Sequence, residues 1–269
     1  MSATARLWLL ATASVLSACG RPPDRRPWLA DAYSPSASAA LTLPEIPTPQ
    51  IEQRDGKNRI AFLGPNGRTY GIRWESVSES VGVPNGGALR RGAQLPKTGP
   101  GYRHVGKNPW GTDEAVTFLQ LAAYVVHDMY PDTVPVVIGD VSRDEGGHLR
   151  PHKSHQSGRD ADVGLFANNN KPLRGFVNLS PSELDVEKTW VYIETLLRTG
   201  QVLYIFLDRR LQPALYRHAR DQGWSEASLD RVFQYPGGRE KTIVRHVAGH
   251  ADHLHVRFTC PADDPECGD

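Results

Sequence analysis

Two short windows of this 269-residue chain hold most of its histidines, and they constrain the fold more than any other feature. Seven of the ten histidines lie at residues 148–155 or 246–255. The first window continues as His155-Gln156-Ser157-Gly158-Arg159-Asp160-Ala161-Asp162, and the second ends in His250-x-x-His253-x-His255. Two histidines and one aspartate from separate segments make an N,N,O ligand set, which suits zinc and leaves a fourth position open to water. We therefore expect a fold that brings both windows to one metal ion.

The spacing inside the windows predicts a strand, a tight loop and a strand rather than a helical site. His155 and Asp162 are seven residues apart with Gly158 between them, and no HExxH motif occurs. Residues 253–259 alternate in character, with one face formed by His253, His255 and Arg257 and the other by Leu254, Val256 and Phe258. Because alternate residues of a strand project side by side, one of these histidines can bind the metal while its neighbour meets the substrate.

The rest of the chain predicts helices and short strands without an internal repeat. Thr112 is the predicted N-cap of a helix that ends near Tyr130, and a second helix begins at Ser182 or Asp185 and ends near Arg198. Further strands are predicted at residues 59–63, 70–74, 134–141 and 202–208, and short helices at 213–222 and 226–233. The segment 82–102 is dense in glycine and proline and is predicted to be an ordered loop.

The N-terminus has the features of an export signal. Arg6 precedes the apolar run 7–16, which is too short to span a bilayer as a helix. Leu16-Ser17-Ala18-Cys19 resembles a bacterial lipobox, in which cleavage precedes the cysteine and the thiol is lipidated. We therefore predict a signal peptide over residues 1–18 and a lipidated Cys19, with an ordinary signal peptide as the alternative.

The predicted anchor sets the expected location and domain order. Gly20, rather than an aspartate, follows the cysteine, which favours a periplasmic protein anchored to the outer membrane. Residues 19–57 are rich in Pro, Ala, Ser and Thr and predict a flexible tether. With 39% hydrophobic residues, the chain can bury a sizeable core, and we expect one domain over residues 58–262 and a tail over 263–269.

Charge and cysteine content narrow the possible partners. The formal net charge is +1, and it falls to zero once the predicted signal peptide with Arg6 is removed. Bulk electrostatics therefore gives no reason to expect nucleic acid as a partner, and membrane contact is expected only through the lipid anchor. Cys260 and Cys267 flank a short loop rich in proline and aspartate, and an exported compartment permits a disulfide between them.

The paired windows resemble the penicillin-insensitive murein endopeptidases, a branch of the zinc peptidases grouped with lysostaphin, D-alanyl-D-alanine peptidases and hedgehog domains. The resemblance rests on His152-x-x-His155-Gln156-Ser157-Gly158-x-Asp160-x-Asp162 and on His250-x-x-His253-x-His255, and in general pattern it covers about residues 75–261. It implies an α+β fold in which a small antiparallel sheet carries the zinc site and is flanked by helices. It also implies one Zn²⁺ ion and the cross-link peptides of peptidoglycan as the substrate.

Carried over by position, the resemblance implies a role for individual residues. The zinc ligands would be His155, Asp162 and His255, and the base or transition-state stabilisers would be His253 and His250. His152 matches another histidine of the family's site. Asp185 could stand for an acid that the family places in mid-chain, although Lys188 lies near the expected histidine, so a second metal is in doubt. Residues expected to orient the ligands or face the substrate are Asp140, Ser154, Arg159 and Asp160, and those expected at the surface or in packing are His104, His148, His218 and His246.

The expected function is a zinc-dependent murein endopeptidase that hydrolyses the D-alanyl to diaminopimelate cross-links of peptidoglycan. Serine-type chemistry is not supported, because no serine stands in a nucleophile-elbow context. Two alternatives stay open. One is a D-alanyl-D-alanine carboxypeptidase or LD-endopeptidase of the same fold, and the other is a lipoprotein that binds zinc or peptidoglycan without turnover.

Overall fold

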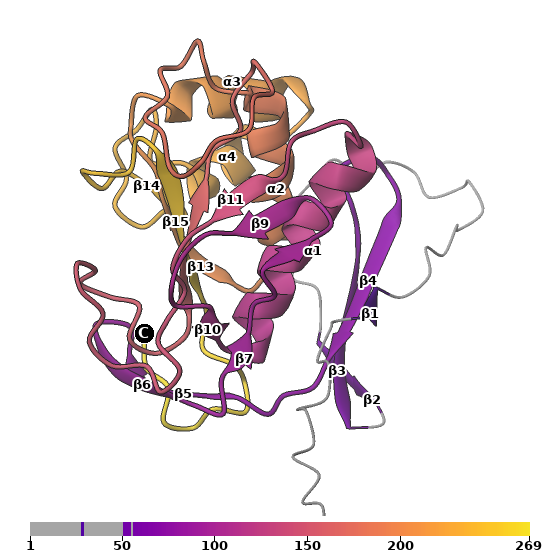
Figure 1. The fold of residues 1–269 in the computed structure, drawn as a ribbon. Helices are drawn as coiled ribbons and strands as arrows, with labels where there is room; N and C mark the ends of the chain where they lie inside the picture. Colours follow the sequence, from indigo (N-terminus) through magenta and orange to yellow (C-terminus); the bar gives the residue numbers. More distant parts are fainter. Residues whose placement is uncertain (1–27, 30–50, 55) are drawn as a thin grey trace, which may run out of the picture.

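The computed structural model describes residues 28–29, 51–54 and 56–269; the predicted signal peptide, Cys19 and most of the predicted tether lie outside them. The described residues form an α+β fold (Figure 1). Its helices are α1 (Asp113–Met129), α2 (Val186–Arg198), α3 (Gln212–Asp221) and α4 (Glu226–Val232). Its strands are β1 (Trp28–Leu29), β2 (Glu52–Arg54), β3 (Lys57–Leu63), β4 (Thr69–Trp74), β5 (Glu79–Val83), β6 (Gly86–Arg90), β7 (Ala93–Gln94), β8 (Thr98–Gly99), β9 (Tyr102–His104), β10 (Trp110–Gly111), β11 (Val136–Ile138), β12 (Asp160–Gly164), β13 (Val202–Phe206), β14 (Val244–Arg245) and β15 (His253–Phe258).

A seven-stranded sheet in the order β14-β13-β15-β12-β11-β9-β8 is the centre of the molecule. Its middle strands β13, β15, β12 and β11 pair antiparallel, as the sequence implies for the strands that carry the histidine windows. The sheet as a whole is mixed, because β11 with β9 and β13 with β14 run parallel. None of the helices among the described residues combines the length and apolar composition that crossing a membrane requires.

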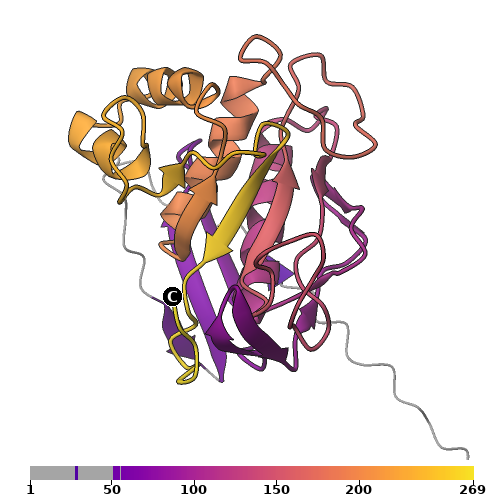
Figure 2. The ribbon, with the colours of Figure 1, turned by 90° about the vertical axis from the view of Figure 1, so that its left-hand side faces the viewer.

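The predicted alternation of β15 divides the sheet into a core face and an open face. Leu254, Val256 and Phe258 are buried, and the ring of Phe258 lies 6.3 Å from that of Phe118 in α1. The helices therefore cover one face of β12 and β15, and Figure 2 views these strands with α1 behind them. The other face, which carries His253 and His255, is left for the functional site.

Helix α1 lies between the central sheet and an N-terminal sheet of order β1-β4-β3-β2 (Figure 1). Its predicted start is confirmed, because the side chain of Thr112 accepts a hydrogen bond from the backbone of Ala115. Trp74 of β4 packs edge-on against Phe118 at 5.2 Å between ring centroids. Two segments of the predicted tether belong to this sheet, since β1 pairs with β4 and β2 with β3.

The segment 82–102 is not the loop that its composition predicts. Strands β5 and β6 form a hairpin in which Val83 pairs with Gly86, and further short strands follow. Pro84 and Asn85 form the two-residue connection, and proline at the first connecting position with Gly86 directly after the second is a signal for a β-turn. Density in glycine and proline here marks tight turns between strands.

Burial of Glu114 near the start of α1 makes the fold sensitive to pH. One carboxylate oxygen accepts from the Trp74 indole at 2.8 Å, the other has no hydrogen-bond partner, and burial raises the pKa to about 7 from 4.5. The unfolded chain therefore loses this proton first, so stability is expected to fall by about 3 kcal/mol between pH 4.5 and 7.

Glu114→Gln, which copies the protonated acid in shape, is expected to match the unsubstituted protein in urea unfolding at pH 4.5. At pH 8 it should be more stable by about 3 kcal/mol. The exposed Glu145→Gln serves as control and should not change the pH dependence. Parallel stability curves for Glu114→Gln and the unsubstituted protein would contradict this account.

Candidate metal centre

The pairing of β12 with β15 places two of the predicted ligands directly opposite each other. Asp162 is the cross-strand partner of His255, and on the other side of β15 His255 pairs with Phe206 of β13. The side chains of Asp162 and His255 are both nearly fully buried. The ring of Phe206 stacks on that of His255 at 5.1 Å and 19°, which restricts the imidazole on one side.

His155 reaches the same point from the loop that precedes β12. Its backbone is in the left-handed region, at φ +66°, which costs a residue with a side chain on the order of 1–3 kcal/mol. Three bonds hold it there. Its N–H donates to Asp160 at 3.0 Å, its carbonyl accepts from Ser142 at 2.8 Å, and its Nδ1 lies 2.6 Å from the Val141 carbonyl.

Donor atoms of the three predicted ligands form a small triangle. Oδ1 of Asp162 lies 3.3 Å from Nε2 of His155 and 3.1 Å from Nδ1 of His255, and the two nitrogens are 3.2 Å apart. Zinc usually lies about 2.0–2.1 Å from its ligand atoms. Four ligand atoms placed tetrahedrally at that distance are about 3.3 Å from one another. The triangle therefore has the size that one tetrahedral zinc ion requires.

The number of protons available at this triangle also favours a bound cation. The Val141 carbonyl can only accept, so Nδ1 of His155 carries the proton and its Nε2 lone pair faces the triangle. The Asp162 oxygen is an acceptor as well. Among the three atoms, only Nδ1 of His255 can carry a proton that points into the triangle. One proton cannot pair with both remaining atoms, so one lone pair stays without a partner. A bound cation would be attracted by all three atoms at once.

His152 lies beside the triangle and offers a second arrangement. His152, His155 and Asp162 present ligand atoms within 4.8 Å of one another. His152 approaches the other carboxylate oxygen, Oδ2 of Asp162, at 3.5 Å, whereas the triangle forms on Oδ1. Its other nitrogen lies 3.5 Å from Asp140, and this contact lowers the pKa of Asp140 and raises that of His152. Asp140 thus holds His152 and does not contact the ring of His155.

Asp160 connects both predicted ligand histidines from beneath the site. Its side chain is fully buried, accepts from the backbone of His155 and lies 3.4 Å from Nε2 of His255. Arg257 donates two bonds to the same carboxylate, at 2.7 and 3.0 Å. Partners of this kind orient ligands and commonly change metal affinity by 10–100-fold when removed.

Electrostatics keeps the acids of the site ionised. Burial opposes ionisation of Asp162, but the neighbouring rings of His155 and His255 hold the pKa of its carboxyl well below the usual range. Burial also opposes ionisation of Asp160, whose pKa is held well below the usual range by His255 and Arg257. For His255 burial alone would lower the pKa, yet the two aspartates outweigh it and raise the pKa to about 9. The site therefore attracts positive charge.

The triangle lies in a cleft of about 670 Å³. His253 lines this cleft with its Nε2 3.6 Å from Oδ1 of Asp162, and the ring of His250 lies 4.9 Å from that of His253. Burial lowers the pKa of His250, and the neighbouring His253 adds to the effect. The apolar part of the lining comes from Val83, Pro84, Phe176, Phe206, Val247 and Ala248, and Lys153 and Arg257 contribute positive charge. The cleft thus combines apolar walls with a larger number of polar and charged side chains.

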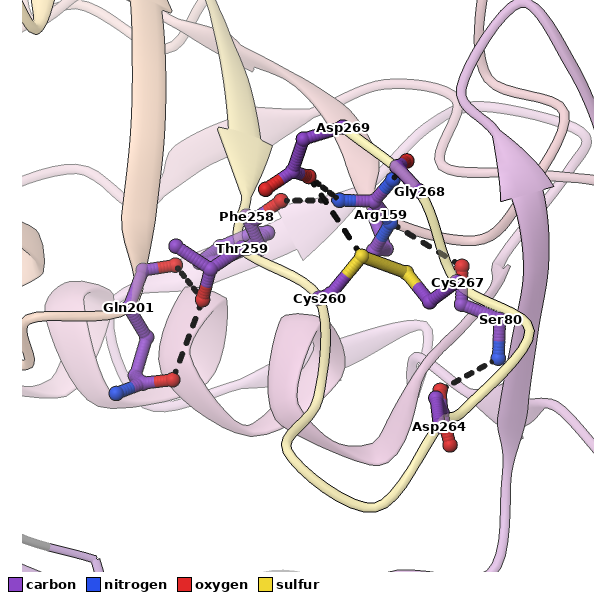
Figure 3. The surroundings of a disulfide bond; sticks show 10 residues. All are labelled: Ser80, Arg159, Gln201, Phe258, Thr259, Cys260, Asp264, Cys267, Gly268 and Asp269. Atoms are coloured by element: carbon purple, nitrogen blue, oxygen red, sulfur yellow. Dashed lines mark hydrogen bonds and ion pairs between the residues drawn. A yellow bond between two sulfur atoms is a disulfide. The ribbon is translucent and has the colours of Figure 1, made fainter.

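The C-terminal segment helps to form one wall. Arg159, which the sequence predicts to orient the ligands or face the substrate, is fully buried and donates to the Phe258 and Gly268 carbonyls and to the carboxylate of Asp269, as Figure 3 shows. Cys260 and Cys267 form a disulfide that closes the intervening loop (Figure 3). Asp269 lines the cleft. Arg159 thus anchors this wall and is not exposed to substrate.

Removing the disulfide by Cys260→Ser with Cys267→Ser is expected to lower the free energy of unfolding by about 2–3 kcal/mol, because the short loop is no longer closed in the unfolded chain. Urea unfolding under oxidising conditions measures the difference. A reductant added to the unsubstituted protein should reproduce the loss and leave the double variant unchanged. Equal urea midpoints for the two proteins would contradict the prediction.

The remaining predicted residues lie apart from the triangle. Asp185 caps α2 and pairs with Lys188 at 2.8 Å, and neither residue lines the cleft. Ser154 lines the cleft, whereas four histidines expected at the surface or in packing do not: His104, His148, His218 and His246. Sequence reasoning missed the aromatic walls, Phe176 and Phe206. Phe206 lies within the strand predicted at residues 202–208 and is the last residue of β13, but only the pairing of β13 with β15 shows which side chain it meets.

Comparison with known proteins gives one consistent family. A family model described as penicillin-insensitive murein endopeptidase matches residues 80–191, which include the first histidine window. A penicillin-insensitive murein endopeptidase of Klebsiella pneumoniae subsp. pneumoniae is 26% identical over 237 residues, covering 78% of this chain and 79% of the relative. One from Haemophilus influenzae is 26% identical over 212 residues (72% and 68%), and one from Yersinia enterocolitica is 31% identical over 149 residues (50% and 48%).

Proposed function

The chain belongs to the penicillin-insensitive murein endopeptidase family, and on this premise we propose that it is a zinc-dependent enzyme that hydrolyses the D-alanyl to diaminopimelate cross-links of peptidoglycan. The names of the relatives support a peptidase that acts on murein. The proposed zinc dependence is supported by one observation. Three donor atoms, from His155, Asp162 and His255, lie within 3.3 Å of one another at the cleft.

In this proposal His155, Asp162 and His255 hold a single zinc ion. The ion, when bound, supplies a Lewis acid that polarises the scissile carbonyl and lowers the pKa of the attacking water. Asp160 keeps both histidines in place, through the backbone of His155 and beside the ring of His255. These contacts fix the ligand set before substrate arrives.

His253 is the group placed to move a proton. Its Nε2 faces the cleft beside Asp162, so it can take a proton from the attacking water and pass one to the leaving amine. His250 donates its Nδ1–H to the Val247 carbonyl at 3.1 Å, so in the neutral ring its Nε2 lone pair is a second proton acceptor beside His253. No serine or cysteine nucleophile is required, because water attacks directly.

The lining of the cleft suits a peptide with charged side groups. Its apolar walls can contact the methyl groups of alanine residues, and Lys153 can attract the carboxylates that cross-link peptides carry. Residues that line the cleft come from the β5–β6 hairpin, from the loop between β11 and β12 (residues 139–159, the His loop) and from the segment before β15.

Digestion of isolated sacculi tests this function. Purified protein should convert cross-linked muropeptides into monomers, chelator should stop the reaction, and added zinc should restore it, with the products identified by mass. Cleavage that releases only terminal D-alanine, or cleavage on the other side of diaminopimelate, would instead indicate the carboxypeptidase or LD-endopeptidase alternative. Absence of any chelator-sensitive product would leave the non-catalytic binding protein.

We also propose that the chain acts in the periplasm, anchored to the outer membrane through a lipid on Cys19. This part rests on the sequence, since Cys19 lies outside the described residues. Labelling cells with a radioactive fatty acid should mark the protein, and Cys19→Ser should abolish the label and release the protein from outer-membrane fractions. Retention of the label in Cys19→Ser would refute the proposed lipidation site.

A further inference from the structure

Asp252, immediately before β15, points its carboxylate at His253. Its Oδ1 lies 2.6 Å from Nδ1 of His253. Within the part of the chain that the structure describes, this is the only hydrogen bond or ion pair of the Asp252 side chain. The carboxylate is about a third exposed, so it is not needed to satisfy a buried donor elsewhere. Its orientation toward His253 therefore has no other structural explanation.

The ring of His253 is held in one orientation by its neighbours. Phe176 stacks on it with 4.8 Å between ring centroids and 20° between planes, and the ring of His250 lies on another side at 4.9 Å. With Nδ1 at Asp252, the other nitrogen, Nε2, lies 3.6 Å from Asp162 and faces the cleft. The two nitrogens thus face two different carboxylates.

A neutral imidazole has one N–H, and the better acceptor determines which nitrogen carries it. The contact to Asp252 at 2.6 Å has hydrogen-bond length, whereas 3.6 Å to Asp162 is beyond it. In the neutral ring this geometry therefore favours the proton on Nδ1. That leaves the Nε2 lone pair directed into the cleft, which is the state that a general base needs.

We infer that Asp252 is a positioning residue, whose carboxylate fixes His253 in the Nδ1–H tautomer and so makes Nε2 available to accept a proton from substrate water. The inference rests on the proposed function of His253. Asp252 touches neither substrate nor the metal triangle. Without its carboxylate, the Nε2–H tautomer can form and direct its proton toward Asp162, and in that state His253 cannot act as a base.

Asp252→Asn tests the inference because asparagine keeps the shape and can donate to Nδ1. We expect kcat on purified cross-linked muropeptide to fall about 10²–10⁴-fold, with KM and zinc content unchanged. Asp252→Glu, which restores a carboxylate, should recover part of the rate. Asp144→Asn, an exposed acid of the His loop, is the matched control and should retain full activity.

The tautomer itself gives a readout that does not depend on turnover. In zinc-loaded, ¹⁵N-labelled protein at about pH 8, two-bond proton–nitrogen correlations of the His253 ring can be assigned by their loss in His253→Ala. The unsubstituted protein should show a protonated Nδ1, and Asp252→Asn should shift the proton to Nε2. The same tautomer in both proteins, or a ring protonated at both nitrogens, would overturn the inference. An inactive parent protein would instead refute the proposed function and leave this spectroscopic test intact.

Discussion

His255→Ala is expected to abolish both zinc retention and hydrolysis of cross-linked muropeptides. The ring supplies one corner of the triangle, 3.1 Å from Asp162 and 3.2 Å from His155. Loss of a residue that only orients a ligand commonly costs 10–100-fold in affinity or rate. Loss of the ligand itself should lower both the zinc affinity and the rate of hydrolysis by more than about 100-fold.

Elemental analysis after dialysis and the release of muropeptide monomers measure the two losses. His148→Ala is the matched control, because this histidine lies in the His loop but is exposed and outside the cleft. It should bind one zinc per chain and keep full activity. A His255→Ala protein that retains stoichiometric zinc would show that the ion is held by a different set of residues.

His253→Ala is expected to give the opposite combination, with zinc retained and activity lost. The imidazole borders the triangle, but Nε2 is 3.6 Å from Asp162 and faces the cleft, where it can exchange protons with substrate. Removing a general acid–base group typically lowers the rate by 10²–10⁴-fold. The loss should appear in kcat, because the cleft walls that bind substrate remain.

Single-turnover and steady-state rates on a defined muropeptide dimer, together with zinc content, test this second expectation. His246→Ala provides the control, since this exposed histidine belongs to the same window but lies outside the cleft. If His253→Ala loses zinc in parallel with activity, the residue is a ligand and the assignment of roles in β15 must change.

The division of β15 into two faces is predictable because strand periodicity is local. The alternation in residues 253–259 set His255 and Leu254 on opposite faces before any pairing was known, and the structure has that division. The helix start at Thr112 was equally local, because a capping side chain and its partner are three residues apart. Such signals need only neighbours in sequence.

Features that depend on pairing between distant segments could not be predicted. The stacking of Phe206 on His255 follows from the register of β13 and β15. Arg159 is buried because the C-terminal segment folds back over its guanidinium group, which donates to the Gly268 carbonyl. The β5–β6 hairpin was missed for a different reason, since its turn residues were counted as loop composition. Asp252 could have been noticed as the acid adjacent to His253, but only the structure shows its direction.

An anomalous difference map from crystals of the zinc-loaded protein, recorded on both sides of the zinc absorption edge, tests the central claim most directly. The account predicts one peak in the cleft, within bonding distance of Nε2 of His155, Oδ1 of Asp162 and Nδ1 of His255. A peak held by His152 with His255 out of reach, or no peak at these residues, would contradict it.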